Sequence, residues 1–474
     1  MDLFSLLLLL QSLSSSYAQN AGKSKPEKPV PFIVKECGSG SSCKDLSGGL
    51  TIDANWRWTH DKDQEGQKCY DGSAWTQACS GTGEECAKKC VIEGAGDYDA
   101  TYGVKGDGKD GVTLKYVTKN DNGRNAGSRM YFLEQGGEKY HMFKLKNKQF
   151  EFDVDVSNLP CGVNGALYFT AMEQDGGKSK NPSNGAGAKY GTGYCDAQCP
   201  KDIKWINGKA NNKGWKGDGG NVGAGDMGVC CPEMDIWEAN SVAQAFTSHT
   251  CKSLTPAVCT GDQCGDTSAN RYNGLCDKDG CDFASYRWGA KEFYGQGKKV
   301  DTSKKFTVVT QFITKGNTDD GELIEVRRMY RQNGNLIKNE AVKVKGLDKP
   351  ADSLTDQFCQ ANKAATGDHD SFKDRGGMKA MGEAMKNGMV LVLSIWDDAT
   401  AKMQWLDGIY PPNGSADKYG VKRGPCDPNS GDPGPLRDSK PDSQVTFSNV
   451  KIGPIDNSAE KSTPAKQKRS TFYI

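Results

Sequence analysis

Alternating apolar and polar residues mark the clearest strands of this sequence. In QFEFDVDVS, residues 149–157, the phenylalanines and valines share one face and the carboxylates the other, which predicts a half-buried β-strand. MVLVLSIWDD, residues 389–398, is apolar over most of its length, which predicts a strand buried on both faces. VTFSNVKIGPI, residues 445–455, predicts the last strand of the chain.

Residues 324–340, IEVRRMYRQNGNLIKNE, predict a hairpin, because Asn333-Gly334 between two extended runs favours a type I′ turn. Strands do not alternate with long helices, as they would in a parallel sheet, and 58 glycines indicate many turns and long loops. We therefore expect an all-β fold, a jelly-roll sandwich of two antiparallel sheets.

The one helix that the pattern indicates lies near residue 380. Met378, Met381 and Met385 recur at helical spacing, and Lys386 followed by Gly388 ends it. We interpret the methionines as core packing, not as a ligand site. No internal repeat or Ser/Thr/Pro-rich linker divides the chain, so we expect one domain over 19–455. The tail, 456–474, is polar and basic, and we expect it to be disordered.

The N-terminus, MDLFSLLLLLQSLSSSYAQN, predicts a secretory signal peptide over 1–18. Its apolar core from Leu3 to Leu13 is shorter than the roughly 20 residues that span a bilayer. Ser16 and Ala18 are the small residues of a cleavage site. The leader has no Lys or Arg, and an uncleaved anchor is the alternative.

Charge and cysteine content narrow the partners and the compartment. Lys+Arg 61 against Asp+Glu 60 gives a net charge of +1, so no strong field attracts nucleic acid or an anionic membrane. Eighteen cysteines behind an export signal indicate disulfides in a secreted, extracellular protein. With four histidines and no pair of CxxC motifs, a metal cluster is disfavoured. A neutral partner fits best.

The stretch CCPEMDIWEAN, residues 230–240, places Glu233, Asp235 and Glu238 within six positions. A helix would scatter these three side chains around its axis. On a strand, Glu233 and Asp235 share a face, but Glu238 has the wrong parity. One β-bulge between Asp235 and Glu238 restores the parity, because two residues then occupy one place in the ladder. We therefore predict a bulged strand that aims all three carboxylates into one cleft.

Two carboxylates on either side of one bond are what glycoside hydrolysis uses. In the retaining mechanism, one attacks the anomeric carbon and the other protonates the leaving oxygen. Asp235 between them can share a proton with Glu233. Crowding of like charges raises the pKa of one member, as an acid catalyst requires.

A solvated acidic patch and a calcium site are the alternatives for this motif. Ile236 and Trp237 within it favour a packed strand over a solvated patch. Calcium suits Asp277, Asp279 and the following glycine better, but no glutamate stands at the twelfth position of that loop. We expect no metal at either place.

Several motifs, in order along the chain, are similar to glycoside hydrolase family 7. They are TIDANWRWTH (51–60), CGVNGALYF (161–169), GYCDAQCPKDIKWING (193–208), CCPEMDIWEAN (230–240) and LSIWDDATAKMQWLD (393–407). The resemblance runs from about Gln19 to Pro454. It implies a secreted cellobiohydrolase or endoglucanase that cleaves β-1,4-glucan with retention. It also implies a concanavalin-like jelly roll whose long, disulfide-stapled loops cover a cellulose-binding groove. We expect a monomer that acts on cellulose and cello-oligosaccharides and needs no cofactor.

The resemblance assigns roles residue by residue. Glu233 matches the nucleophile, Glu238 the general acid/base, and Asp235 the carboxylate that partners the nucleophile. His249 matches a histidine beside these carboxylates. Tryptophans are expected to bind the flat faces of the sugar rings. The full set of expected substrate-binding residues is Trp56, Trp58, Trp396, Trp405, Tyr168, Asn164, Arg129, Asp196, Gln198 and Lys204, with Arg271 and Arg423 on the product side. For Arg129 and Lys204, a structural ion pair is the alternative. We assign Trp237 to the core.

The resemblance also implies a disulfide pairing that uses all eighteen cysteines. The pairs are Cys37–Cys43, Cys69–Cys90, Cys79–Cys86, Cys161–Cys426, Cys195–Cys231, Cys199–Cys230, Cys251–Cys276, Cys259–Cys264 and Cys281–Cys359. Two of these bridges anchor the predicted catalytic strand to the segment that carries Asp196 and Gln198. One glycosylation sequon is present, at Asn413.

Loop lengths favour one cutting mode. Long segments at 214–229, 265–274 and 397–402 favour a roofed tunnel, and hence a processive cellobiohydrolase that releases cellobiose from reducing ends. The alternative is an endoglucanase with an open groove. From other classes, the same fold can serve as a non-catalytic glucan-binding lectin or as a purely structural disulfide scaffold. The three carboxylates oppose both.

Overall fold

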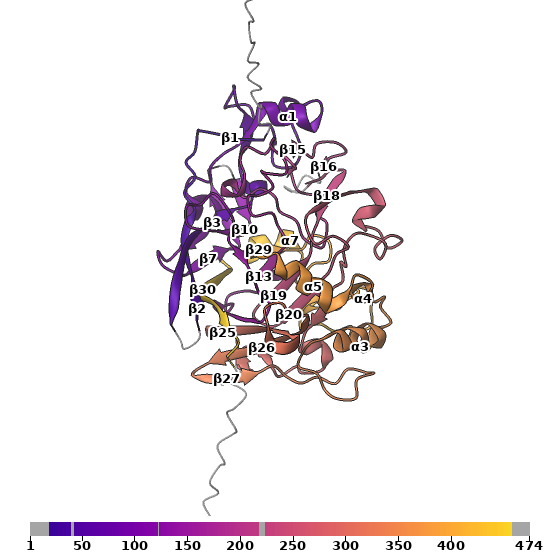
Figure 1. Cartoon of the computed structure of the whole chain (residues 1–474). Helices are drawn as coiled ribbons and strands as arrows, with labels where there is room; N and C mark the ends of the chain where they lie inside the picture. Colours follow the sequence, from indigo (N-terminus) through magenta and orange to yellow (C-terminus); the bar gives the residue numbers. More distant parts are fainter. Residues whose placement is uncertain (1–18, 39–41, 122, 218–222, 457–474) are drawn as a thin grey trace, which may run out of the picture.

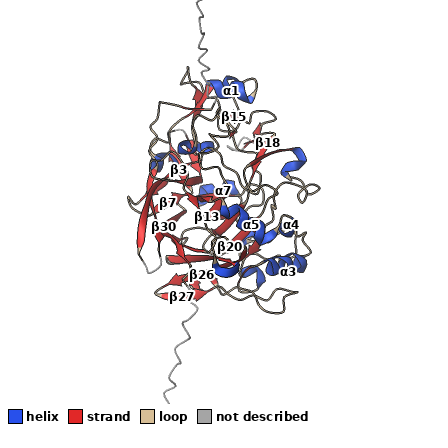
Figure 2. Cartoon of the chain, in the orientation of Figure 1, coloured by secondary structure: helices blue, strands red, loops and turns tan. Residues whose placement is uncertain are grey.

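The alternating segments form two antiparallel sheets that pack face to face (Figures 1 and 2). The structure, a computed structural model, describes residues 19–38, 42–121, 123–217 and 223–456. The expected signal peptide and all but the first residue of the expected tail lie outside these ranges. No helix among the described residues is long and apolar enough to cross a membrane.

The first sheet carries the predicted catalytic strand near its centre. Its strands, in the order in which they pair, are β2 (Val30–Cys37), β3 (Cys43–Ile52), β10 (Ser128–Leu133), β29 (Met389–Asp397), β13 (Val163–Thr170), β19 (Glu233–Ala239), β20 (Gln244–His249) and β22 (Cys281–Phe283). The short β11 (Met142–Phe143) also pairs with β29. All of these strands, β11 included, run antiparallel to their neighbours within this sheet.

The second sheet packs against one face of the first. Its strands, in pairing order, are β6 (Val104–Gly106), β7 (Val112–Lys115), β30 (Gln444–Pro454), β12 (Lys148–Asp155), β25 (Phe306–Thr314) and β26 (Leu323–Gln332), with β27 (Asn335–Lys338) and β28 (Ser353–Leu354) beyond. β2 joins the sheets at one edge, because it pairs with β3 and, in parallel, with β30.

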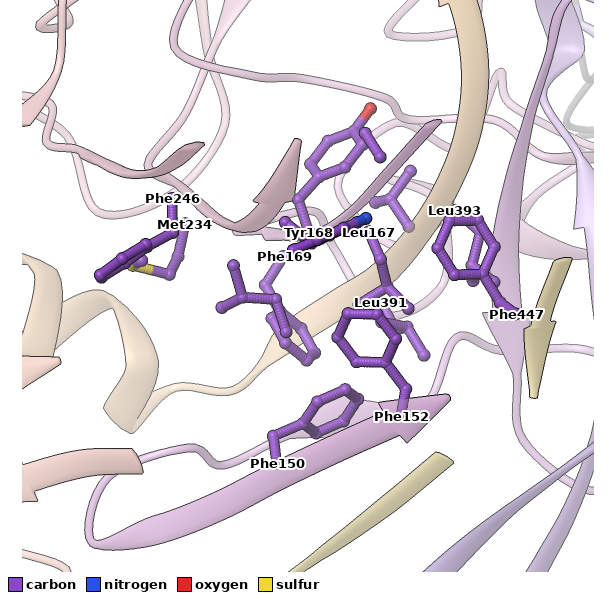
Figure 3. Close-up of a cluster of buried hydrophobic side chains, with 14 of the residues drawn as sticks. Phe150, Phe152, Leu167, Tyr168, Phe169, Met234, Phe246, Leu391, Leu393 and Phe447 are labelled. Carbon is purple, nitrogen blue, oxygen red and sulfur yellow. The ribbon is translucent and has the colours of Figure 1, made fainter. Parts of the chain in front are cut away.

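Aromatic side chains from both sheets interdigitate between them. On β12, Phe150 lies edge-on to Phe169 of β13, with ring centroids 5.1 Å apart, and Phe152 lies 6.3 Å from Trp237 of β19. Figure 3 shows Phe150 and Phe152 pointing toward the residues of the first sheet. All four rings are fully buried, and each buries on the order of 150–250 Å². The core assignment of Trp237 is confirmed.

The strands and the turn predicted from periodicity are confirmed. β12 buries its phenylalanines and valine while its carboxylates stay half-exposed, and β29 is buried on both faces over most of its length. Asn333 and Gly334 join β26 to β27 with φ values of 52° and 76°. Two successive positive φ angles are those of a type I′ turn.

The methionine helix is confirmed, but the expectation of one helix is wrong. α5 (Gly377–Lys386) buries all three methionines, and Gly388 follows it with φ of 88°. The longest helix is α3 (Asp356–Thr366), capped by the Thr355 hydroxyl. The others are α1 (Gly83–Lys89), α2 (Tyr98–Tyr102), α4 (Ser371–Asp374), α6 (Gln404–Asp407) and α7 (Pro433–Ser439). Apolar periodicity did not predict α3, because the buried face of this helix includes the polar residues Asn362 and Lys363.

All eighteen cysteines form disulfides, and the nine pairs are those that the resemblance implies. They are Cys37–Cys43, Cys69–Cys90, Cys79–Cys86, Cys161–Cys426, Cys195–Cys231, Cys199–Cys230, Cys251–Cys276, Cys259–Cys264 and Cys281–Cys359. Two of them, Cys195–Cys231 and Cys199–Cys230, tie the segment 195–199 to the residues immediately before β19. They therefore fix this segment beside the catalytic strand.

Candidate active site

β19 contains the predicted bulge. Against β20, Asp235 pairs with Thr247 and Glu238 with Ala245, so three steps along β19 oppose two along β20. The pairing of β19 with β13 shifts at the same place. Glu233, Asp235 and Glu238 are between 4 and 9% exposed. The bulge therefore brings the three carboxyl groups into one buried cluster.

Each outer glutamate accepts one hydrogen bond from a neighbouring segment. The backbone N–H of Ala197 donates to Glu233 Oε2 at 3.0 Å. The amide of Asn164, on β13, donates to Glu238 Oε1 at 3.0 Å. The donors come from different segments, because Ala197 belongs to a loop and Asn164 to the adjacent strand β13. One oxygen of each glutamate is thus held by a hydrogen bond.

His249 binds the central carboxylate. Its Nδ1 lies 2.8 Å from the carbonyl oxygen of Asp277, and its Nε2 lies 3.2 Å from Asp235 Oδ2. A carbonyl oxygen only accepts, so Nδ1 carries a proton. Burial opposes a charge on the ring, but the hydrogen bond and charge of Asp235 outweigh burial and raise the pKa of His249 to about 9. His249 is therefore an imidazolium paired with Asp235 at neutral pH.

Burial and mutual repulsion act on the two glutamates. Burial, followed by the charge of Asp235, raises the pKa of Glu233 well above its ordinary value. The same two causes raise the pKa of Glu238. The Ala197 N–H and the Asn164 amide oppose these shifts without cancelling them. A site of this kind retains protons at pH values where exposed carboxyl groups have lost them.

One donor atom from each of Glu233, Asp235 and His249 lies within 4.8 Å of the other two. These residue types bind divalent metals in other proteins. Here His249 Nε2 already faces Asp235, and Glu233 accepts from the backbone. The arrangement fits a network that shares protons better than a set of metal ligands.

Tyr168 and Asp196 extend the network beyond Glu233. The hydroxyls of Tyr168 and Tyr194 lie 2.9 Å apart, and Tyr194 donates to Asp196 Oδ2 at 2.7 Å. Asp196 also accepts from the backbone N–H of Gln198 at 2.7 Å. Burial raises the pKa of Asp196. The exposed Gln198 side chain donates to the carbonyl of Lys278 at 2.8 Å, so it crosses to another loop.

Arg129 forms an ion pair and also contacts two aromatic rings. It pairs with Asp53 at 2.6 Å, which confirms the structural ion pair. Its guanidinium also lies 3.4 Å from the ring centre of Tyr194 and 5.5 Å from that of Trp56. Trp56 is half-buried, and its indole N–H donates to Gly127 O. Arg129 thus connects Trp56, through Tyr194, to the carboxylate cluster.

Lys204 and Trp58 lie farther from the carboxylates. Lys204 is buried and forms no ion pair among the described residues; its ammonium lies 4.7 Å from the ring centre of Tyr70. Burial lowers the pKa of Lys204 to about 8. The half-buried Trp58 stacks on His60, with ring centroids 4.2 Å apart. Sequence reasoning missed these supporting rings.

Trp396 and Trp405 lie on the Glu238 side of the cluster. Their rings stack at 6.2 Å with 28° between their planes, and both are half-buried. Trp396 pairs across the ladder with Asn164, whose amide holds Glu238. The indole N–H of Trp405 donates to Asp398 Oδ2 at 3.0 Å. The two stacked rings form one aromatic surface beside Glu238, the predicted acid.

Arg271 and Arg423 are both paired with carboxylates. Arg271 pairs with Asp279 at 2.5 Å, and Arg423 lies 3.3 Å from Asp282. The guanidinium of Arg423 lies 5.8 Å from the ring centre of Tyr410. Burial lowers the pKa of Arg271, but the charge and hydrogen bond of Asp279, with a smaller contribution from Tyr410, raise it. Both arginines therefore border one region. The pairing of Asp279 also disfavours calcium binding at its loop.

Several supporting residues were missed in the sequence. Tyr194 stands two positions before Asp196, inside a recognised motif, so the alternation of that segment was a usable signal. Asp53 also lies in a recognised motif, TIDANWRWTH, but its contact with Arg129, like that of the Asp277 carbonyl with His249, forms only in the folded chain.

The elevated pKa of His249 predicts a pH-dependent contribution to stability. Since its folded pKa of about 9 exceeds the ordinary 6.5, the contribution is full below pH about 6.5 and is lost as pH rises through 9. His249→Gln should lower the unfolding free energy by about 3 kcal/mol at pH 6 and by much less at pH 10, as measured by denaturant titration. His369→Gln, at a half-exposed ion pair with Asp374, is the control. A loss that is the same at both pH values would contradict this prediction.

Comparison with known proteins agrees with this geometry. The model of glycosyl hydrolase family 7 matches residues 21–459. A family 7 cellobiohydrolase from Daphnia pulex is 47% identical, with a TM-score of 0.90, and a cellobiohydrolase from Melanocarpus albomyces, complexed with cellotetraose, is 44% identical, with a TM-score of 0.86. A Humicola insolens endocellulase is 34% identical, with a TM-score of 0.77. Each match covers 92% of this chain and 99% of the other.

The match extends over nearly all of the described residues and includes the strand with the three carboxylates. The nine disulfides and the two-sheet architecture agree with it. The chain belongs to glycosyl hydrolase family 7.

Proposed function

We propose that the protein is a secreted, retaining β-1,4-glucan hydrolase that acts on cellulose and cello-oligosaccharides. The observation that carries this proposal is the bulge in β19, which gathers Glu233, Asp235 and Glu238 into one buried cluster. Similar solved structures include a cellobiohydrolase complexed with cellotetraose and an endoglucanase complexed with cellobiose. Secretion is supported by the leader sequence and by the nine disulfides.

In the first chemical step, Glu233 attacks the anomeric carbon while Glu238 gives its proton to the departing glycosidic oxygen. The N–H of Ala197 holds one oxygen of Glu233, which leaves the other to attack. The raised pKa of Glu238 keeps its proton available. A covalent glycosyl-enzyme results.

In the second step, Glu238 takes a proton from water, and the water displaces Glu233 from the sugar. Asp235 stays paired with the His249 imidazolium throughout, so a fixed charge pair stands beside the reacting groups. Its negative charge favours the protonated form of Glu238 in each cycle. The charge of the His249 imidazolium acts in the opposite sense and lowers the pKa of Glu238, so the ring holds Asp235 in place but does not itself favour the acid form.

The half-buried tryptophans supply the binding surface. Trp396 and Trp405 border the Glu238 side, and Trp56 continues the line through Arg129 and Tyr194. Flat rings suit the C–H faces of glucosyl units, and buried polar groups replace the water lost by sugar hydroxyls. We assign Trp58 to the far end of this line and the Arg271 and Arg423 region to the product.

We assign the processive, cellobiose-releasing mode. The two cellobiohydrolases are 47% and 44% identical to this chain, whereas two endoglucanases are 36% and 34% identical. The segment 265–274 is present and presents Arg271, and the segment after Trp396 supplies Asp398 to Trp405. Part of the segment 214–229 lies outside the described residues.

Glu233→Gln should abolish turnover without abolishing binding, because the amide keeps the size of the side chain but cannot attack. We expect kcat on an aryl β-cellobioside to fall by about 10⁴-fold or more, while the Kd for cellotetraose changes little. Glu36→Gln, the same change on the exposed face of β2, should leave both values unchanged. Normal turnover by Glu233→Gln would overturn the assignment of the nucleophile.

Activity should follow a bell-shaped pH profile with a mildly acidic optimum. Burial and Asp235 raise the pKa of Glu238, so its proton, and with it the activity, is lost only above the range in which an exposed glutamate ionises. Initial rates of aryl β-lactoside hydrolysis at constant ionic strength measure this profile. An optimum above neutrality would contradict the acid role of Glu238.

Cutting mode is tested by product distribution. On crystalline cellulose, soluble cellobiose should greatly exceed the new reducing ends that remain in the solid, because a processive enzyme stays on one chain. Carboxymethylcellulose should lose viscosity slowly. A rapid loss of viscosity with few soluble sugars would instead identify an endoglucanase and overturn the processive assignment alone.

A further inference from the structure

The bulge leaves one residue of β19 outside both ladders. Glu233, Met234, Glu238 and Ala239 pair with β13 and β20, while Asp235 pairs only with β20 and Trp237 only with β13. Ile236 pairs with neither strand and is fully buried. A buried carbonyl without a ladder partner needs another donor, because leaving it unsatisfied is costly.

Arg328 supplies that donor from the opposite sheet. It belongs to β26, where it pairs with Thr310 of β25, and its side chain is 1% exposed. Its Nη2 donates to the carbonyl oxygen of Ile236. The contact therefore runs through the core, from a strand of the second sheet to the bulge of the first.

The guanidinium has unusual surroundings for a buried cation. Among the described residues no carboxylate forms an ion pair with it, and the polar side chain that interacts with it is that of Tyr330. Its Nε and Nη1 are buried. It lies over aromatic rings instead: its centre is 4.4 Å from that of Phe246 and 5.9 Å from those of Trp237 and Tyr330. Phe246 stands on β20 opposite the bulge. Cation–π contacts offset part of the cost of burying the charge.

We propose that Arg328 is a positioning residue that holds the β19 bulge in place and thereby sets the direction of Glu238. The register shift falls between Asp235 and Glu238, so the bulge alone decides whether Glu238 shares a face with the other two carboxylates. A charge buried without a carboxylate partner adds little stability. The Nη2 of Arg328 donates to the carbonyl of Ile236, the one residue of β19 without a register partner in either ladder.

This inference rests on the proposed function, because its consequence is a loss of acid catalysis. If the bulge relaxes, Glu238 moves away from the glycosidic oxygen, while Glu233 keeps its own ladder partners and the Ala197 N–H. Substrates whose leaving group needs a proton should then suffer more than substrates whose leaving group does not.

The experiment compares phenyl and 2,4-dinitrophenyl β-cellobioside as substrates of the full chain. Phenol leaves poorly without a proton, and dinitrophenol leaves well. For Arg328→Met, which has similar length and no charge or donor, kcat/KM on the phenyl glycoside should fall at least about tenfold more than on the dinitrophenyl glycoside. Arg328→Lys keeps the positive charge and one donor nitrogen, and it should show a smaller change in that ratio.

Arg327→Met is the matched control, since Arg327 is the adjacent residue of β26 and is half-exposed beside Glu325. It should keep the parental ratio. Equal losses on both substrates in Arg328→Met, or no loss on either, would overturn the inference. If Arg328→Met does not fold, Arg328→Lys decides: an unchanged ratio overturns the inference and a shifted ratio supports it. A parent chain that hydrolyses neither glycoside would refute the proposed function instead.

Discussion

Three carboxyl groups buried side by side are the constraint on which the rest of the structure depends. Neighbouring negative charges repel one another, and the protein interior does not solvate them. The cluster is therefore stable only if each carboxyl group has a hydrogen-bonding or charged partner. The structure supplies one for each group: the Ala197 N–H for Glu233, the His249 ring for Asp235, and the Asn164 amide for Glu238. Each of these partners comes from a different segment, so the site exists only when the whole fold is formed.

Two disulfides fix the position of one of these partners, the Ala197 N–H. Cys195–Cys231 and Cys199–Cys230 tie the segment around Ala197 to the residues that lead into β19. Ala197 lies midway between the two bridged cysteines, so its N–H cannot drift from Glu233 without moving both bridges. A donor fixed before substrate arrives costs nothing to organise during the reaction. The adjacent cysteines therefore serve the site as well as general stability.

Local signals predicted more of this molecule than long-range ones did. Period-two alternation located β12, and the parity of three carboxylates located the bulge, because both depend on neighbours along one strand. α3 was missed because buried Asn362 and Lys363 break its apolar face; Asn362 donates to Asp282, across 80 residues. The pairing of Arg328 with Ile236 spans 92 residues and depends on how two sheets face each other. Sheet register, which no local pattern encodes, decides such contacts.

One short loop links the chemistry to the binding surface. Cys276 and Cys281 close its two ends with disulfides to other segments, and between them the Asp277 carbonyl holds His249 while Asp279 holds Arg271. The loop must lie almost against the imidazole: at Gly280, where φ is 66°, an added Cβ would approach His249 Cε1 to 2.5 Å. The Arg271 ion pair and the imidazole that holds Asp235 are therefore both fixed to the same disulfide-bounded loop.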